Sequence, residues 1–238
     1  MSERSSAGRA WYECLRRVVW FFWAGGYWVR YTGRENIPPE GAVLVTPNHQ
    51  SYLDPPLVGA GCPRPLNYLA RKSLFRFPPF RWLIDSLDAI PLDTEGIGFG
   101  GIKETLRRLR RGEMVLVFPE GSRTWDGEVG SFQPGFATLA TRGRAAILPV
   151  AIEGAFEAWP RWETVPRLGV IHVHYGVPIL AEEVKRLGDE ELIAEVRRRV
   201  CACQAVLRRR RPFVRRGPLA RSRPVAHAFD EGPGTHRL

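Results

Sequence analysis

A histidine and an aspartate five positions apart are the first residues in the chain whose types and spacing suit a reaction. They are His49 and Asp54, within residues 48–54 (NHQSYLD). A histidine exchanges a proton near neutral pH, so it suits removal of a proton from a hydroxyl group. An aspartate on one ring nitrogen fixes the tautomer and leaves the other nitrogen to act as the base. The pair predicts general-base chemistry, and the alternative is a helix-capping aspartate beside an ordinary loop histidine.

A second polar group follows about 70 residues later. Residues 118–124 read FPEGSRT and come directly after the apolar run 114–118 (MVLVF). Gly121 permits close approach of the backbone, and Arg123 can form a two-pronged bond with a phosphate. Glu120 can hold that arginine or accept a hydroxyl. The plainer interpretation of this group is a tight turn that carries a surface ion pair.

Strand-like and helix-like segments alternate along the chain and explain how the two groups can meet. Short apolar or alternating runs predict strands at 42–46, 66–70, 89–92, 114–118, 146–152 and 169–175. Helices are predicted at 54 onward, 102–111, 135–142 and 181–210. This order is typical of an α/β domain with a mixed, largely parallel sheet flanked by helices. Ligands of such sheets bind beyond the carboxyl ends of the strands, where both polar groups are expected.

The amino-terminal part predicts a helix at a membrane surface. Residues 18–29 (VVWFFWAGGYWV) are uncharged and strongly apolar, with arginines on both sides. The run is too short to cross a bilayer, which takes about 20 residues. We expect an amphipathic helix in the interface, with Trp20, Trp23, Tyr27 and Trp28 at headgroup depth. A helix packed on the core of the domain is the open alternative.

Positive charge is concentrated at the carboxyl end. The 238 residues carry a formal net charge of +10, and residues 208–238 contribute nine arginines against two acidic residues. We expect this tail to be disordered and to meet anionic lipid headgroups rather than nucleic acid, with a solvated tail as the alternative. The chain then divides into an interfacial helix region (1–32), an α/β domain (33–211) and a basic tail (212–238).

Other patterns argue against several kinds of site. The four cysteines lack the spacing of a zinc site and suggest a reducing compartment. His172 and His174 share one face of a strand, but no third ligand suggests itself, so we expect no metal. The glycines between 96 and 101 lack the spacing of a phosphate-binding fingerprint and predict a plain loop. No Gly-x-Ser-x-Gly elbow is present.

The two polar groups resemble the signature of the 1-acylglycerol-3-phosphate acyltransferases and related glycerolipid acyltransferases. That family has a block N-H-x4-D followed by F-P-E-G-[TS]-R, and residues 48–54 and 118–124 match both in order. The resemblance extends over roughly residues 33–180. Weaker matches are GRENIP at 33–38, ARKSL at 70–74 and ILPV at 147–150.

The resemblance implies a reaction. His49, oriented by Asp54, would take the proton from the hydroxyl of a lysophospholipid, most simply 1-acylglycerol-3-phosphate, giving phosphatidate. The alkoxide would attack an acyl thioester directly, without a covalent acyl-enzyme. The donor would be acyl-coenzyme A or acyl carrier protein, a substrate, with no cofactor required. The residues implied in substrate binding are Arg71, Lys72, Glu120, Gly121, Ser122 and Arg123.

One block departs from the family pattern. The family usually has Asp-Arg where this chain has Asp93-Thr94, and that arginine is often credited with binding the phosphate of the acceptor. The acceptor therefore stays open between lysophosphatidate, another lysophospholipid and a lyso-aminolipid. A non-catalytic lipid-binding protein is the alternative to an enzyme. Either protein is expected at the cytoplasmic face of a membrane, peripheral or monotopic, and the sequence indicates no oligomeric state.

Overall fold

The computed structural model describes residues 6–71, 81, 89–92 and 99–210. Within them, one sheet has the strand order β1-β7-β6-β2-β5-β3-β4. All neighbouring strands pair in parallel except β6 and β7, which are antiparallel. The strands are Trp28–Thr32 (β1), Val43–Pro47 (β2), Leu66–Arg71 (β3), Ile90–Leu92 (β4), Met114–Leu116 (β5), Ala146–Glu153 (β6) and Val170–Tyr175 (β7). The expected mixed, largely parallel sheet is confirmed.

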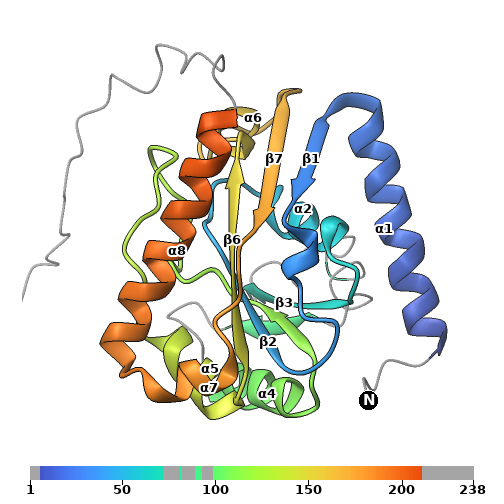
Figure 1. The fold of residues 1–238 in the computed structure, drawn as a ribbon. Coiled ribbons are helices and arrows are strands. Elements are labelled where there is room, and N and C mark those ends of the chain that lie inside the picture. Colours follow the sequence, from blue (N-terminus) through green and yellow to red (C-terminus); the bar gives the residue numbers. More distant parts are fainter. Residues whose placement is uncertain (1–5, 72–80, 82–88, 93–98, 211–238) are drawn as a thin grey trace, which may run out of the picture.

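Helices cover both faces of this sheet (Figure 1). The apolar run of β2 shows why, because Val43 and Val45 join one buried cluster and Leu44 joins the other. Successive side chains of a strand point to opposite faces, so a strand that is apolar throughout must be buried on both. The helices are Ser6–Gly26 (α1), Asp54–Gly61 (α2), Phe99–Arg110 (α4), Gly135–Gly143 (α5), Ala155–Ala158 (α6), Ala181–Arg186 (α7) and Asp189–Arg210 (α8), with a 3-10 turn at Arg34–Asn36.

The three central strands end at the same edge of the sheet. β2 pairs in parallel with β5 on one side and with β6 on the other. The segments that follow them therefore begin side by side. Those segments carry His49 after β2, Glu120 after β5 and α6 after β6. The fold thus brings the two polar groups of the sequence to one edge.

The amino-terminal region differs from its prediction. Helix α1 ends at Gly26, and Trp28–Thr32 forms the edge strand β1, which pairs with β7. The prediction that Tyr27 and Trp28 belong to the helix is therefore wrong. β-Branched and aromatic residues in this stretch suit a strand, and β7 offers an unpaired edge. The sheet begins before residue 32, where the helix region was expected to end.

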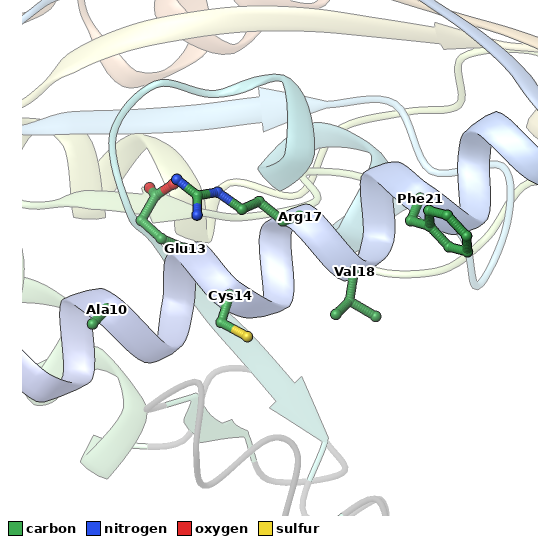
Figure 2. Close-up of a pocket in the computed structure, with 6 residues that line it drawn as sticks. All are labelled: Ala10, Glu13, Cys14, Arg17, Val18 and Phe21. Atoms are coloured by element: carbon green, nitrogen blue, oxygen red, sulfur yellow. The ribbon is translucent and has the colours of Figure 1, made fainter.

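Helix α1 packs on the domain through one face and exposes the other. Arg16 Nη1 donates to the Cys62 carbonyl and Trp20 Nε1 to the Ala60 carbonyl, both at 3.1 Å. The opposite face carries Ala10, Cys14, Val18 and Phe21 (Figure 2). The described helices include none that is long and apolar enough to cross a membrane. One face of α1 therefore packs on the domain, which was the alternative that the sequence left open.

Candidate active site

His49 and Asp54 contact each other at the end of β2. His49 Nδ1 lies 2.8 Å from Asp54 Oδ2. The same oxygen accepts the backbone N–H groups of Gln50 and Ser51, at 2.6 and 2.7 Å. The Asp54 side chain is fully buried. Three donors on one oxygen stabilise a charged carboxylate in that position, and the carboxylate in turn favours the proton on Nδ1.

The sequence suggested Asp54 as a possible N-cap of α2, but the structure does not place it there. The helix begins at Asp54, and its N-cap is Leu53. Because the Asp54 side chain turns back to the loop before the helix, it closes a small ring of hydrogen bonds with residues 49–51. The helix start and the two prolines after it fix the position of the carboxylate.

The histidine ring is also fixed by stacking. The rings of His49 and Phe118 are 3.8 Å apart between centroids and inclined by 18°. The His49 side chain is 18% exposed, and no described group hydrogen bonds to its second nitrogen, Nε2. A ring held on Nδ1 and on one face, with Nε2 accessible, has the geometry of a general base. Phe118 supplies an aromatic contact that the sequence analysis did not assign.

The two polar groups are joined by hydrogen bonds. The Thr124 N–H donates to the His49 carbonyl at 2.8 Å, and the His49 N–H donates to Glu120 Oε1 at 2.9 Å. Glu120 Oε2 accepts the N–H of Gly130 at 3.2 Å. Glu120 therefore contacts backbone and not Arg123, which corrects one expected role of this carboxylate. Glu120 thus links the loop after β2 to the loop after β5 through hydrogen bonds.

The charge state of Glu120 gives a prediction on stability. Burial raises the pKa of Glu120 from 4.5 to about 7, against the hydrogen bonds from His49 and Gly130, which lower it. The negative charges of Asp54 and Asp126 raise this pKa further. Between about pH 4.5 and about pH 7 the folded protein keeps a proton that the unfolded chain has released. The free energy of unfolding therefore falls as the pH rises through this window.

Glu120→Gln is expected to remove that part of the pH dependence. Glutamine does not titrate and loses one acceptor oxygen, so the stability deficit of the variant is largest near pH 4.5 and shrinks as the pH rises towards about 7. Urea unfolding of both proteins at several pH values between about 4.5 and about 8 measures the difference. If the free energy of unfolding changes with pH equally in the variant and the wild type, Glu120 does not carry this proton.

Arg123 lies beside the histidine loop. Its guanidinium carbon is 3.5 Å from the centroid of the Tyr52 ring, and Tyr52 lies between His49 and Asp54. The guanidinium nitrogen Nη1 of Arg123 is buried and has no hydrogen-bond partner. A cation held by an aromatic face, with an unused donor, is suited to an anionic ligand.

Gly121 shapes the turn that carries Arg123. Its φ of 70° lies in the left-handed region that favours glycine, and its N–H donates to the Phe118 carbonyl at 3.1 Å. That N–H is therefore already used. Ser122, the next residue, is exposed, and no described group accepts its N–H.

Arg71 and Lys72 are the remaining residues expected in substrate binding. Lys72 lies outside the described residues, as do Asp93 and Thr94. The Arg71 backbone is the last residue of β3 and pairs with Leu92 of β4. β3 is parallel to β5, and its carboxyl end therefore points to the edge that carries His49.

A buried polar network connects the histidine loop to α8, and no pattern in the sequence indicated it. The Gly127 carbonyl accepts the side chains of Gln50 and Gln204, both at 3.0 Å, and that of Arg208 at 3.3 Å. Gln50 is the neighbour of His49, whereas Gln204 and Arg208 belong to α8. Only the tertiary fold brings these residues together, because they are separated by more than 70 positions. The last turns of α8 thereby hold the histidine loop.

Residues with metal-ligating side chains do not cluster in the described part of the chain. His174 Nδ1 instead lies 2.9 Å from the Thr32 hydroxyl, which links β7 to β1. This pairing gives the histidine a structural role at the far edge of the sheet.

Comparisons with known proteins agree with this geometry. The Acyltransferase family model matches residues 28–153. The chain is 31% identical over 167 residues to the 1-acyl-sn-glycerol-3-phosphate acyltransferase of Bacillus subtilis, covering 70% of this chain and 81% of that protein. It is 32% identical over 162 residues to the enzyme of the same name from Pseudomonas aeruginosa, covering 65% of this chain and 61% of that protein.

A solved structure has the same fold. The crystal structure of the 1-acyl-sn-glycerophosphate acyltransferase from Thermotoga maritima superposes with a TM-score of 0.75 at 26% sequence identity. The match covers 87% of this chain and 84% of the other. The residues matched by the family model, 28–153, include both polar groups.

Proposed function

The chain belongs to the Acyltransferase family, and we propose that it transfers a fatty acyl group from a thioester to the free hydroxyl of 1-acyl-sn-glycerol-3-phosphate, giving phosphatidate. The observation that carries the proposal is the contact of 2.8 Å between His49 Nδ1 and the buried Asp54, with no described group hydrogen bonded to Nε2. The names of the relatives from Bacillus subtilis and Pseudomonas aeruginosa support the choice of acceptor.

The proposed reaction is a direct transfer. Nε2 of His49 takes the proton of the acceptor hydroxyl while that oxygen attacks the thioester carbonyl. The new C–O bond gives a tetrahedral oxyanion, whose collapse breaks the C–S bond and expels the thiolate. The thiolate then takes the proton from the imidazolium, which Asp54 stabilises meanwhile. We assign the oxyanion to the backbone at Ser122, because the N–H of Gly121 is already used.

The acyl donor is a substrate in this proposal, either acyl-coenzyme A or acyl carrier protein. No cofactor or metal takes part, since proton transfer and positioning supply the chemistry. The protein is proposed to act as a peripheral enzyme at the cytoplasmic face of a membrane, where a lipid acceptor resides. The outer face of α1, with Val18 and Phe21 exposed, supports that placement.

Arg123 is proposed to bind the phosphate of the acceptor. A charge-assisted hydrogen bond contributes about 1.5–3 kcal/mol, so Arg123→Ala is expected to raise KM for lysophosphatidate about 10- to 100-fold. The KM of Arg123→Lys should lie between those of wild type and Arg123→Ala, because lysine keeps the charge but not the planar guanidinium group. Initial rates over a range of acceptor concentrations measure both. Unchanged KM in Arg123→Ala would place the phosphate elsewhere, with Arg71 and Lys72 as the next residues to test.

An acceptor panel tests the proposed substrate. Initial rates would be compared for lysophosphatidate, lysophosphatidylcholine, lysophosphatidylethanolamine and a lyso-aminolipid, each with both donors. The proposal expects the highest kcat/KM with lysophosphatidate. Thr94, which stands where the family usually has arginine, favours a second candidate, a different lysolipid. A clear preference for one of the other acceptors would keep the mechanism and establish that candidate.

A further inference from the structure

Five exposed apolar side chains lie on segments at the end of the sheet that carries the candidate active site. They are Trp28 at the start of β1, Trp125 in the loop after β5, and Trp162, Val165 and Leu168 between α6 and β7, here called the aromatic rim. Their exposed fractions lie between 48% and 73%. Large apolar side chains exposed together at one place mark a contact surface, whereas single ones do not.

Contacts connect the rim to the site. The rings of Trp125 and Trp162 stack at 6.4 Å between centroids with an angle of 9°. The guanidinium of Arg161 lies 3.6 Å over the Trp125 ring, and its Nη1 donates to the Arg123 carbonyl at 3.1 Å. Through Arg161, Trp125 of the rim is therefore connected to the backbone of Arg123, the residue proposed to bind phosphate.

The rim continues to the amino-terminal helix. The Leu168 side chain packs so close to Gly26 that a Cβ there would lie 2.8 Å from Leu168 Cδ2. The N–H of Trp28 donates to the Gly169 carbonyl at 3.2 Å. The end of α1, the start of β1 and the start of β7 therefore lie together, at the end of the sheet where β6 finishes (Figure 1).

We propose that the aromatic rim docks the protein on a phospholipid bilayer with anionic headgroups, so that the candidate active site faces the lipid surface. This inference rests on the proposed function. Tryptophan is favoured at the bilayer interface, where its ring is partly apolar and partly wet. The cations at the rim complement anionic lipid, because Arg161 lies over Trp125 and the exposed Arg30 follows Trp28 on the same side of β1.

The charges around the rim agree with such a partner. The carboxylate of Glu163, which lies between Trp162 and Val165, is bonded to Arg167 at 2.8 Å. The Asp126 carboxylate, beside Trp125, accepts the Thr124 hydroxyl and the Glu128 N–H. Both carboxylates are held by donors of the protein, which reduces their repulsion of an anionic surface. A lipid acceptor that stays in the bilayer would then have a short path to His49.

Matched variants test this surface. Val165→Ala with Leu168→Ala removes apolar area from the rim. Val177→Ala with Leu180→Ala removes the same groups from the segment between β7 and α7. This segment follows the carboxyl end of β7, whereas the rim lies at its start, and both side chains are similarly exposed. Binding would be measured by sedimentation with vesicles of phosphatidylcholine and phosphatidylglycerol. We expect the rim variant to bind about tenfold more weakly and the control to bind like wild type.

A second pair of double variants distinguishes loss of the interfacial side chains from loss of folding. Trp125→Ala with Trp162→Ala should weaken vesicle binding at least as much, and the corresponding double tyrosine variant should restore most of it. Circular dichroism melting excludes unfolding as the cause. Activity with a short-chain acceptor below its micelle concentration should be unchanged in all variants, which tests the proposed function separately from the rim.

Vesicle binding that is equal in the rim variant and wild type would overturn the proposal. The same holds if the control pair weakens binding equally. If vesicle binding is unchanged but KM for acyl carrier protein rises, the rim binds a protein donor and not a bilayer.

Discussion

His49→Ala is expected to lower kcat for acyl transfer about 10³-fold, with a small change in KM for either substrate. A positioned general base contributes roughly 10²- to 10⁴-fold. The free energy of unfolding should change little, because Asp54 keeps its two backbone donors when the imidazole is removed. Steady-state kinetics at saturating donor and acceptor measure the effect.

The control for this variant is binding of the acceptor. Lysophosphatidate should bind His49→Ala as tightly as wild type, since the phosphate is assigned to Arg123 and not to the base. A variant that keeps more than about a tenth of the wild-type kcat would exclude His49 as the base. A variant that binds no acceptor would assign His49 a binding role instead.

Asp54→Asn is expected to lower kcat by about 10²- to 10⁴-fold and also to destabilise the protein. The amide oxygen can take the place of Asp54 Oδ2, which serves two backbone N–H groups and His49, but it carries no negative charge. The loss of that charge removes stabilisation of the imidazolium. The amide NH₂ group then lies at the buried position of Oδ1, which has no hydrogen-bond partner, and an unsatisfied buried donor costs about 1–3 kcal/mol.

Two measurements together identify this role. Steady-state kinetics at saturating donor and acceptor should show the lower kcat, because the carboxylate that stabilises the imidazolium is gone. Urea unfolding gives the stability change. Loss of stability with kcat unchanged would make the role of Asp54 purely structural, as an anchor of the loop of residues 49–51.

The sequence predicted the sheet well because its strands are short, apolar and bounded by turns. Residues 114–117 (MVLV) and 43–46 (VLVT) are buried, and such apolar runs have few other structures open to them. β1 was missed because Trp28–Thr32 continues an apolar run that suits a helix equally well. Pairing with β7, 142 positions away, decides its structure, and no local pattern contains that information.

The candidate site was predictable to a different extent for each residue. The order of the two polar groups after parallel strands was enough to expect His49 near the second group, and the link from Thr124 to the His49 carbonyl agrees. The role of Glu120 could not be predicted, because its partners are backbone N–H groups that only folding brings near. The support from Gln204 and Arg208 likewise depends on how α8 packs on β6.

The most direct test of the central claim is formation of labelled phosphatidate by the purified protein. A labelled acyl thioester, supplied as acyl-coenzyme A and separately as acyl carrier protein, would be incubated with 1-acyl-sn-glycerol-3-phosphate, and lipid products would be separated and counted. The account predicts phosphatidate that accumulates with time and protein in at least one of the two reactions, at a rate about 10³-fold lower with His49→Ala. Folded protein that binds the acceptor yet forms no acylated product with either donor would contradict it.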